Sequence, residues 1–388
     1  MNRLRLFFVF ILFFLLLVFV FDVSYLFSGV RATYLRGEVS AQIDDSRFFY
    51  NRVVLAKDPV TIPNGHDYSN IIKNNSLEHG LKKSKSVAFL VVQNDSVRCE
   101  KYWGLGKENS LTNSFSVAKS IVSLLVGCAI DGGFISSVEQ SVFDFVPELK
   151  PFHDYDVKVK HLLEMSSGLN WLENYKKPIS VTAKSYYGGD LKKLILERGF
   201  DSPPGITHDY KSGDTQILGV LLERAVGKNI SSFASEVLWS KIGAQNNALW
   251  SLDQEGGVEK TFCCFHSSAR DFSKIGLLML GRGSIFGKRV VDSQYIDWLI
   301  RVGDLNDVDG DEPVDFYANG WWVAEVLEMP IFYARGFNGQ YVVVIPELDL
   351  VFVRLGLKEN ENSVKNNDYK MSDNLKFFVE QVIKDYSL

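Results

Sequence analysis

The sequence predicts an α+β fold in which an antiparallel sheet, formed by both ends of one domain, is flanked by helices. Two pairs of apolar-rich runs support this prediction: residues 87–92 with 97–103, and residues 341–345 with 350–355. A short polar turn separates the two runs of each pair, which is the pattern of a β-hairpin. The chain between the hairpins has helical periodicity, so the two ends of the domain are expected to build one sheet.

Three apolar stripes with helical spacing predict amphipathic helices around that sheet. The first covers residues 121–129 and ends before Gly132, the second covers residues 218–225 and ends before Gly227, and the third covers residues 375–383. Glycine directly after such a stripe is a typical helix stop. The chain is therefore expected to contribute flanking helices and a helical subdomain.

Composition narrows the class of protein. Apolar residues make up 46% of the 388 residues, which is enough for a large core. The 42 basic residues are balanced by 47 acidic ones without blocks of one sign, which excludes a nucleic-acid-binding surface. The cysteines, Cys99, Cys128, Cys263 and Cys264, match no zinc or redox spacing, so no metal site is expected. Cys128 falls on the first helical stripe, which favours a small core residue. The spacing leaves the disulfide state of all four open.

The first residues have the pattern of a membrane-targeting segment. Arg3 and Arg5 precede an apolar run over residues 6–21 that is unbroken on every side. This run fits either a retained transmembrane anchor or a cleaved signal peptide. The anchor is favoured, because only residues 30–32 vaguely match a cleavage site. In both cases the basic end stays inside and the rest of the chain is exported.

These observations predict the organisation of the chain and its location. Residues 1–29 are expected to be the signal anchor or signal peptide, residues 30–76 a polar, aperiodic juxtamembrane extension, and residues 77–388 one continuous domain. The expected location is the inner or plasma membrane, crossed once by the N-terminal helix, with the domain outside the cytoplasm and thus periplasmic in a bacterium. A cleaved signal would make the domain a secreted protein.

The segment Ser116-Val117-Ala118-Lys119 carries the first candidate chemistry. Residues three apart lie on one face of a helix, so the Lys119 amine can reach the Ser116 hydroxyl. A serine becomes a nucleophile when a neighbouring base accepts its proton, and a partly buried lysine with a lowered pKa can do so. The start of the helix also favours developing negative charge. On its own, the pattern is more typical of a capping serine followed by a solvated lysine.

The wider sequence around this motif resembles the serine β-lactamase-related hydrolases. The resemblance rests on SFSVAKSIVSLLVGCAIDGG from Ser114, VKVKHLLEMSSGLNW from Val157 and HDYKSGDTQILGVLLERAVG from His208. Further matching stretches begin at Ser267, Asn319 and Tyr333. This superfamily includes class C β-lactamases, penicillin-binding proteins, esterases and 6-aminohexanoate-dimer hydrolase. The resemblance runs from about residue 80 to the end, and it implies a β-lactamase/transpeptidase-like fold.

The resemblance also implies roles for individual residues. Ser116 would be the nucleophile, Lys119 the base that activates it, and Tyr210 of Tyr-x-Ser the phenol that relays a proton to the leaving group. The backbone N–H groups of Ser116 and Phe337 would form the oxyanion hole, which is usually the main source of stabilisation in acyl transfer. No metal and no organic cofactor is implied.

Two departures from the penicillin-recognising pattern shape the expected substrate. Ser212 replaces the asparagine that reads an acylamino side chain, and Ala334 replaces the lysine that holds a substrate carboxylate. Arg335, next to Ala334, could hold a carboxylate in place of that lysine. With Gly336 starting a Gly-x-x-Gly-Gln stretch, the pattern is more similar to the 6-aminohexanoate-dimer hydrolase and esterase branch.

The resemblance therefore implies an exported serine hydrolase that cleaves a small-molecule or peptide-like amide or ester. Its substrate-binding residues would be Ser212, Arg335 and Gly336. Trp171 and Tyr175 join them, because the resemblance places a substrate-covering segment in the loop-rich insert where they lie. A β-lactamase or D-Ala-type peptidase of the same superfamily, and a catalytically silent binder of cell-wall peptide, remain as alternatives.

Overall fold

A seven-stranded sheet is the central layer of the computed structural model, which describes residues 2–152, 155–308, 310, 312–359 and 371–387. Its strands lie in the order β12-β13-β14-β15-β3-β4-β2, and neighbours are antiparallel except at the edge, where β2 runs parallel to β4. In this order the strands are β12 (Trp322–Val326), β13 (Met329–Gly336), β14 (Gln340–Ile345), β15 (Leu350–Gly356), β3 (Ser86–Gln93), β4 (Ser96–Tyr102) and β2 (Asn64–Ser69).

The two predicted hairpins are confirmed, and they meet in the middle of the sheet. Strands β3 and β4 form one antiparallel hairpin, and β14 and β15 form the other. Strand β15 then pairs with β3, so that Phe352 lies opposite Val91. The sheet is thus completed by both ends of the domain, as the sequence predicts.

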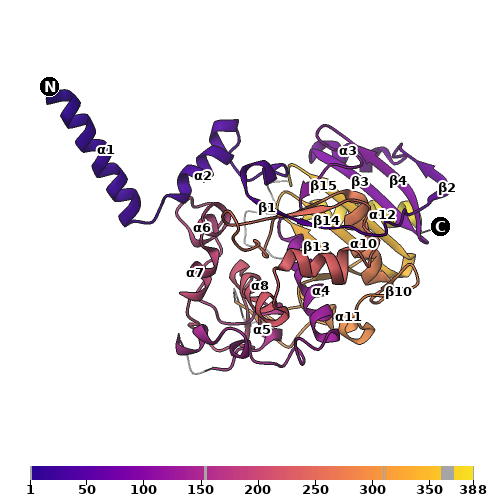
Figure 1. Cartoon of the computed structure of the whole chain (residues 1–388). Helices are drawn as coiled ribbons and strands as arrows, with labels where there is room; N and C mark the ends of the chain where they lie inside the picture. The colour runs from indigo at the N-terminus through magenta and orange to yellow at the C-terminus, as the bar shows by residue number, and fades with distance from the viewer. Residues whose placement is uncertain (1, 153–154, 309, 311, 360–370, 388) are drawn as a thin grey trace.

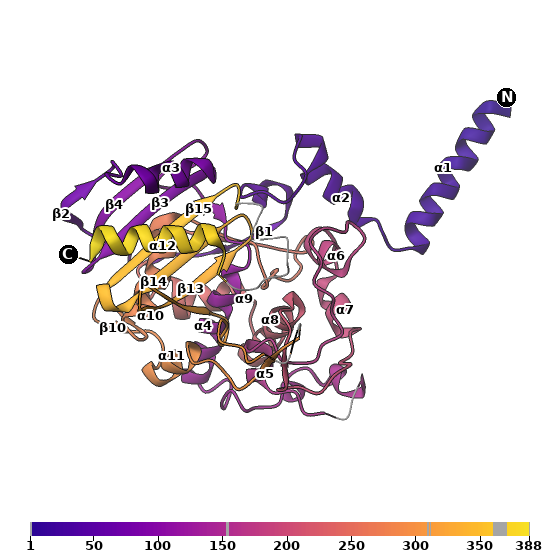
Figure 2. The ribbon, with the colours of Figure 1, turned by 180° about the vertical axis from the view of Figure 1, so that it is seen from behind.

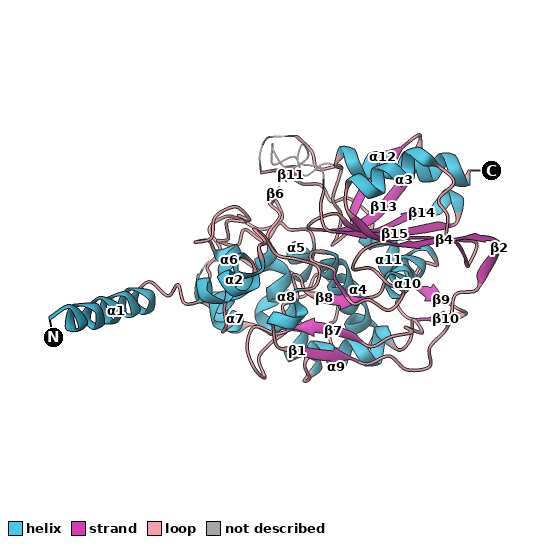
Figure 3. Ribbon diagram, turned by 90° about the horizontal axis from the view of Figure 1, so that it is seen from above, coloured by secondary structure: helices cyan, strands magenta, loops and turns pink. Residues whose placement is uncertain are grey.

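Helices cover both faces of this sheet, because successive strand residues point to opposite sides. Val91 and Phe352 belong to the core under α3 (Asn75–Lys83) and α12 (Asp373–Tyr386), whereas their neighbours Val92 and Val351 belong to the core on the other face. That second face contacts α10 (Ala269–Leu280) and α4 (Val117–Asp131). Figure 3 shows α3 and α12 on one side of the sheet and α10 on the other.

A helical region lies beside the sheet and joins it through α4, which contacts both β13 and α8. Figure 2 shows this region around α5, α7 and α8. Its helices are α5 (Val159–Leu163), α6 (Val181–Tyr187), α7 (Leu191–Leu196), α8 (Ser212–Val226) and α9 (Ile230–Ala234), and α11 (Ser293–Leu299) packs against α4. The predicted helical stripes coincide with α4, α8 and α12.

Smaller sheets connect the helical region to the chain around it. A four-stranded sheet has the order β1-β7-β8-β5. Two strand pairs are separate from it: β6 pairs with β11 in parallel, and β9 pairs with β10 in the antiparallel direction. The strands are β1 (Asn51–Val54), β5 (Thr112–Asn113), β6 (Thr207–His208), β7 (Ala248–Ser251), β8 (Phe265–Ser267), β9 (Ser284–Ile285), β10 (Lys288–Arg289) and β11 (Asn306–Asp307). Residues 30–76, expected to be aperiodic, thus contribute β1 and β2 to sheets.

The N-terminal residues form two helices, α1 (Asn2–Val20) and α2 (Tyr25–Ala32). Figure 1 shows α1 standing apart from the rest of the chain and α2 lying beside α6. Among the described residues, no helix has the combination of length and apolar character that crossing a membrane requires. The transmembrane helix expected over residues 6–21 is therefore not supported.

The cysteines, which the sequence left open, fall into two groups. Cys263 and Cys264 form a disulfide between adjacent residues, while Cys99 and Cys128 are free and buried. Cys128 belongs to α4 and packs in the core, as its place on the helical stripe predicts.

Candidate active site

Ser116 stands at the start of α4, where the chain turns sharply out of β5. Phe115 has a φ of 46°, which is rare for a residue other than glycine and is typical of strained turns at functional sites. The turn is held because the Phe115 N–H donates to Asn113 Oδ1 (2.9 Å) and the Ser114 N–H donates to the Phe265 carbonyl (2.9 Å). The Ser116 side chain does not cap the helix, so its hydroxyl is available for other contacts.

Lys119 lies one helical turn further and is only 3% exposed. Its Nζ donates to Ser116 Oγ (3.0 Å), to the Phe262 carbonyl (2.9 Å) and to Ser212 Oγ (3.3 Å). Burial lowers the pKa of Lys119 from 10.5 to about 8, although the charge of Glu173 opposes this shift. A lysine with this pKa has a substantial neutral fraction near neutral pH, so it can accept a proton from Ser116.

Tyr210 lies on the other side of the Lys119 amine, at the end of the segment that leads into α8. Lys119 Nζ is 5.0 Å from the centre of the Tyr210 ring. The ring is buried between Tyr317 (centroids 5.9 Å apart) and Trp322 (5.5 Å), which fix its orientation. The structure thus brings together the three residues that the motifs single out.

Glu173 is part of this cluster, and the sequence reasoning missed it. Its carboxylate accepts hydrogen bonds from the Ser212 N–H (2.8 Å), the Ser212 hydroxyl (3.0 Å) and the Trp171 indole N–H (2.7 Å). Ser212 therefore connects Glu173 to Lys119. In the sequence, the only signal for Glu173 is that a carboxylate follows Trp171 by two residues in the loop-rich insert.

The end of β13 runs against the turn that presents Ser116. A Cβ atom on Gly336 would lie 2.1 Å from the Ser114 carbonyl oxygen, so only glycine permits this approach. Phe337 follows directly, and its ring contacts Phe115 with centroids 5.5 Å apart. Among the described residues, the backbone hydrogen bonds include none donated by the N–H groups of Ser116 and Phe337.

A cavity of about 220 Å³ opens at Ser116. Of the predicted site residues, Ser116, Ser212, Phe337 and Tyr175 line it. Tyr175 is stacked on Phe337, with ring centroids 6.1 Å apart. The remaining lining residues come from Phe115, from residues 174–178 and α6, from Phe262 and Cys263, and from the N-terminal segment between Leu26 and Ala41.

Trp171, Arg335 and Gly336 do not line this cavity. Trp171 is buried behind Glu173 and orients that carboxylate. The Arg335 guanidinium lies over Trp322 at 5.6 Å and forms an ion pair with Glu359 at 3.7 Å. Arg335 therefore already has a carboxylate of this chain beside it.

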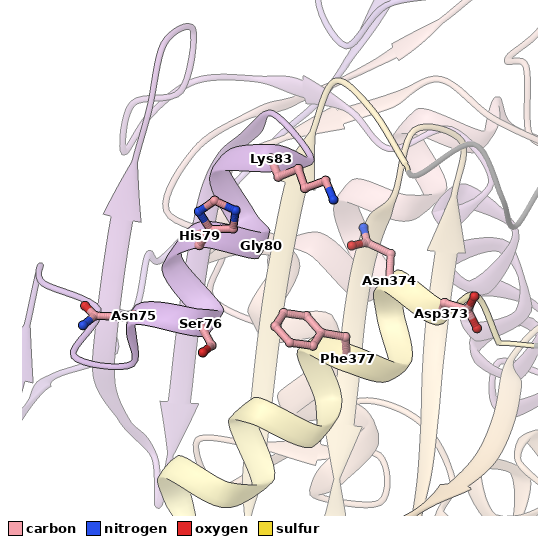
Figure 4. Close-up of a pocket in the computed structure, with 8 residues that line it drawn as sticks. All are labelled: Asn75, Ser76, His79, Gly80, Lys83, Asp373, Asn374 and Phe377. Atoms are coloured by element: carbon pink, nitrogen blue, oxygen red, sulfur yellow. The ribbon is translucent and has the colours of Figure 1, made fainter.

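A larger cavity, of about 480 Å³, lies on the outer face of the sheet between α3 and α12. Figure 4 shows its lining, which includes His79 and Lys83 from α3 and Asp373 and Phe377 from α12. It contains none of the predicted site residues. In the part of the chain that the structure describes, no group of His, Cys, Asp and Glu is arranged to hold a metal ion.

Comparisons with known proteins agree with this geometry. The Beta-lactamase family matches residues 74–372. The 6-aminohexanoate-dimer hydrolase of Paenarthrobacter ureafaciens is 28% identical over 302 residues, which cover 72% of this chain and 74% of that protein.

Solved structures show the same fold. A Bacillus anthracis protein provisionally described as a 6-aminohexanoate-dimer hydrolase has a TM-score of 0.72 at 21% identity, covering 89% of this chain and 92% of its own. A beta-lactamase/D-alanine carboxypeptidase from Yersinia pestis has a TM-score of 0.60 at 18% identity, covering 80% and 96%. These matches confirm the resemblance inferred from the motifs and the β-lactamase/transpeptidase-like fold.

The buried amine predicts a specific pH dependence of stability. Lys119 has a pKa of about 8 in the folded chain and 10.5 when unperturbed, so between these values the unfolded chain binds more protons. The free energy of unfolding should therefore rise with pH in this window, by up to about 1.4 kcal/mol per pH unit from Lys119. Lys119→Met should lack this contribution when denaturant unfolding is measured at both ends of the window.

Lys260 provides a matched control. It is buried away from Ser116, it bonds to the carbonyls of Ser185 and Gly188, and burial lowers its pKa to about 8 as well. Lys260→Met should therefore flatten the pH dependence to a similar extent. The same slope in the wild type and in Lys119→Met would contradict the burial of a charged amine at the site.

Proposed function

Because the chain belongs to the Beta-lactamase family of serine hydrolases, we propose that it cleaves linear amides and esters through an acyl-enzyme on Ser116. The observation that carries this proposal is the 3.0 Å hydrogen bond between Lys119 Nζ and Ser116 Oγ, made by a lysine whose pKa burial lowers to about 8. A nucleophile and a base tuned to the working pH are the minimum that acyl transfer requires.

In the acylation step, neutral Lys119 takes the proton of the Ser116 hydroxyl while the oxygen attacks the substrate carbonyl. The carbonyl oxygen becomes an oxyanion, and the N–H groups of Ser116 and Phe337 stabilise it. Tyr210, beside the Lys119 amine, gives a proton to the leaving amine or alcohol and is reprotonated from Lys119. The products of this step are the acyl-enzyme and the free amine or alcohol.

In the deacylation step, a water molecule attacks the acyl carbonyl and gives its proton to the same relay. The Ser116–acyl bond breaks, the serine recovers its proton, and the carboxylic acid leaves. Glu173 acts as a positioning residue in both steps, because it fixes the Ser212 hydroxyl that contacts Lys119. Its charge also keeps the pKa of Lys119 from falling further.

Linear amides and esters are favoured over penicillins by the residues around the cavity. Ser212 offers one hydroxyl, which is already engaged with Glu173, and Arg335 is paired with Glu359. Neither arrangement favours the bidentate recognition of an acylamino group or a carboxylate. The similarity to a 6-aminohexanoate-dimer hydrolase supports the choice of a linear amide.

The nucleophile is tested with Ser116→Ala. The variant should lose at least about a thousandfold in kcat on p-nitrophenyl butyrate and on a linear amide dimer, because it lacks the attacking atom. It should also fail to react with a fluorophosphonate that labels the wild type at Ser116. Ser120→Ala, on the same helix with its hydroxyl on the Gly320 carbonyl, is the control and should keep the label. Retention of a tenth of the activity by Ser116→Ala would exclude Ser116 as the nucleophile.

The specificity is tested by comparing substrates on one preparation of the wild-type protein. The kcat/KM for benzylpenicillin should be about a hundredfold or more below that for p-nitrophenyl butyrate, since each missing polar contact costs about 1.5 to 3 kcal/mol. A linear amide dimer should also be turned over. A kcat/KM for penicillin equal to that for the ester would instead favour a β-lactamase or a D-Ala-type peptidase.

We also propose that the N-terminal run directs export. Arg3 and Arg5 precede apolar side chains of α1, and those described are largely exposed, among them Leu6, Phe10 and Leu12. Exposed apolar surface of this extent is typical of segments that contact lipid or a targeting machinery. A fusion of alkaline phosphatase to the C-terminus should be active in a bacterial host, and replacing Leu12 with Arg should abolish that activity. Full phosphatase activity of the Leu12→Arg fusion would contradict export by this run.

A further inference from the structure

The N-terminal segment forms one side of the cavity at Ser116. Residues between Leu26 and Ala41 line it together with the domain residues, and Ser116 lies among the latter. This segment is outside the part of the chain that matches the Beta-lactamase family, which begins at residue 74. The chemistry at Ser116 and the wall opposite it therefore come from different parts of the chain.

The wall is docked on the domain by specific contacts. The Tyr25 hydroxyl donates to the Pro178 carbonyl (3.2 Å), and Lys184 forms an ion pair with Asp22 just before α2. Tyr25 and Ala32, at the two ends of α2, are only 6% and 1% exposed. These contacts place α2 against α6, as Figure 1 shows.

Gly29 lies where α2 contacts α6 and also lines the cavity. A Cβ atom at this position would lie 3.4 Å from Cδ2 of the Tyr187 ring, in ordinary contact, so the packing tolerates a small side chain. Gly29 and Tyr187 both line the cavity. A larger side chain at position 29 is therefore expected to occupy part of the cavity.

The lining of the cavity combines apolar and charged side chains. Leu26, Val30 and Val39 contribute apolar side chains from the N-terminal segment, and Lys176 and Lys177 contribute charged ones from the loop before α6. With a volume of about 220 Å³, the cavity is smaller than a drug-sized pocket, which is roughly 300 Å³ or more. A slender chain therefore fits this space better than a bulky ring system.

We propose that the segment from Tyr25 to Ala41 is a specificity wall that limits the length of the apolar substrate chain that enters this cavity. This inference rests on the proposed function and adds the substrate dimension that the catalytic residues do not determine. Burial of each further methylene is favourable until the chain reaches the wall, and beyond that length it meets α2.

Two variants of the full-length protein change the wall in opposite directions. Gly29→Leu fills the cavity, and Leu26→Ala enlarges it. Leu35→Ala is the matched control, because Leu35 is 78% exposed on the same segment and does not line the cavity. The readout is kcat/KM for p-nitrophenyl acetate, butyrate, hexanoate, octanoate and decanoate.

In the wild type and in Leu35→Ala, kcat/KM should rise with chain length and then fall once the chain meets the wall. Gly29→Leu should lower the hexanoate-to-acetate ratio about tenfold or more, which is the usual effect of one or two methylenes in an apolar pocket. Leu26→Ala should move the optimum to a longer ester than in the wild type. Labelling of Ser116 by a small fluorophosphonate confirms that each variant is folded at the site.

The possible failures are distinguishable. If acetate is hydrolysed and Ser116 is labelled in all variants, but the chain-length profile is the same in each, the wall is overturned and the proposed function stands. If the wild type hydrolyses no ester and Ser116 is not labelled, the proposed function is overturned and the wall with it.

Discussion

The burial of the Lys119 amine is the constraint on which the rest of the site depends. An ammonium removed from water is costly unless its protons are bonded, and Lys119 has three donors for three acceptors: Ser116 Oγ, the Phe262 carbonyl and Ser212 Oγ. These acceptors belong to the start of α4, the start of α8 and the chain before β8. The lysine thus fixes three distant segments of the chain around one nitrogen atom, and a shift of any of them would leave a buried donor unpaired.

The electrostatics of the site balance two requirements. A carboxylate in direct contact with Lys119 would keep it charged, and the amine could not act as a base. Without any nearby anion, burial alone would lower its pKa further. Glu173 lies between these extremes, because the Ser212 hydroxyl separates it from Lys119. The resulting pKa of about 8 leaves the amine able to accept a proton and to hold it during the reaction.

The sequence predicts those parts of the structure that depend on local spacing. The hairpins and the α4, α8 and α12 helices have apolar periods that show in the sequence, and the Ser-x-x-Lys and Tyr-x-Ser motifs locate their residues within them. Glu173 has no such pattern, because its role arises only when its loop folds against α8. The N-terminal wall has no sequence pattern for the same reason. The α2 helix lines the cavity only because it packs against α6, about 150 residues further along the chain. The sequence predicts that Trp171 contacts the substrate, whereas in the structure its indole N–H donates a hydrogen bond to Glu173.

The site therefore combines a rigid part with a part that varies more easily. Gly336 packs so closely against the Ser114 carbonyl that any side chain at this position would clash, and the end of β13 therefore lies directly against the turn before α4. The segment from Tyr25 to Ala41 carries no catalytic group and is attached by a few side-chain contacts. Changes in that segment alter the size of the cavity and leave the relay in place. The substrate chain contributes binding energy only where it fits the cavity. A change in the segment from Tyr25 to Ala41 can therefore change the preferred substrate length while the catalytic residues stay the same.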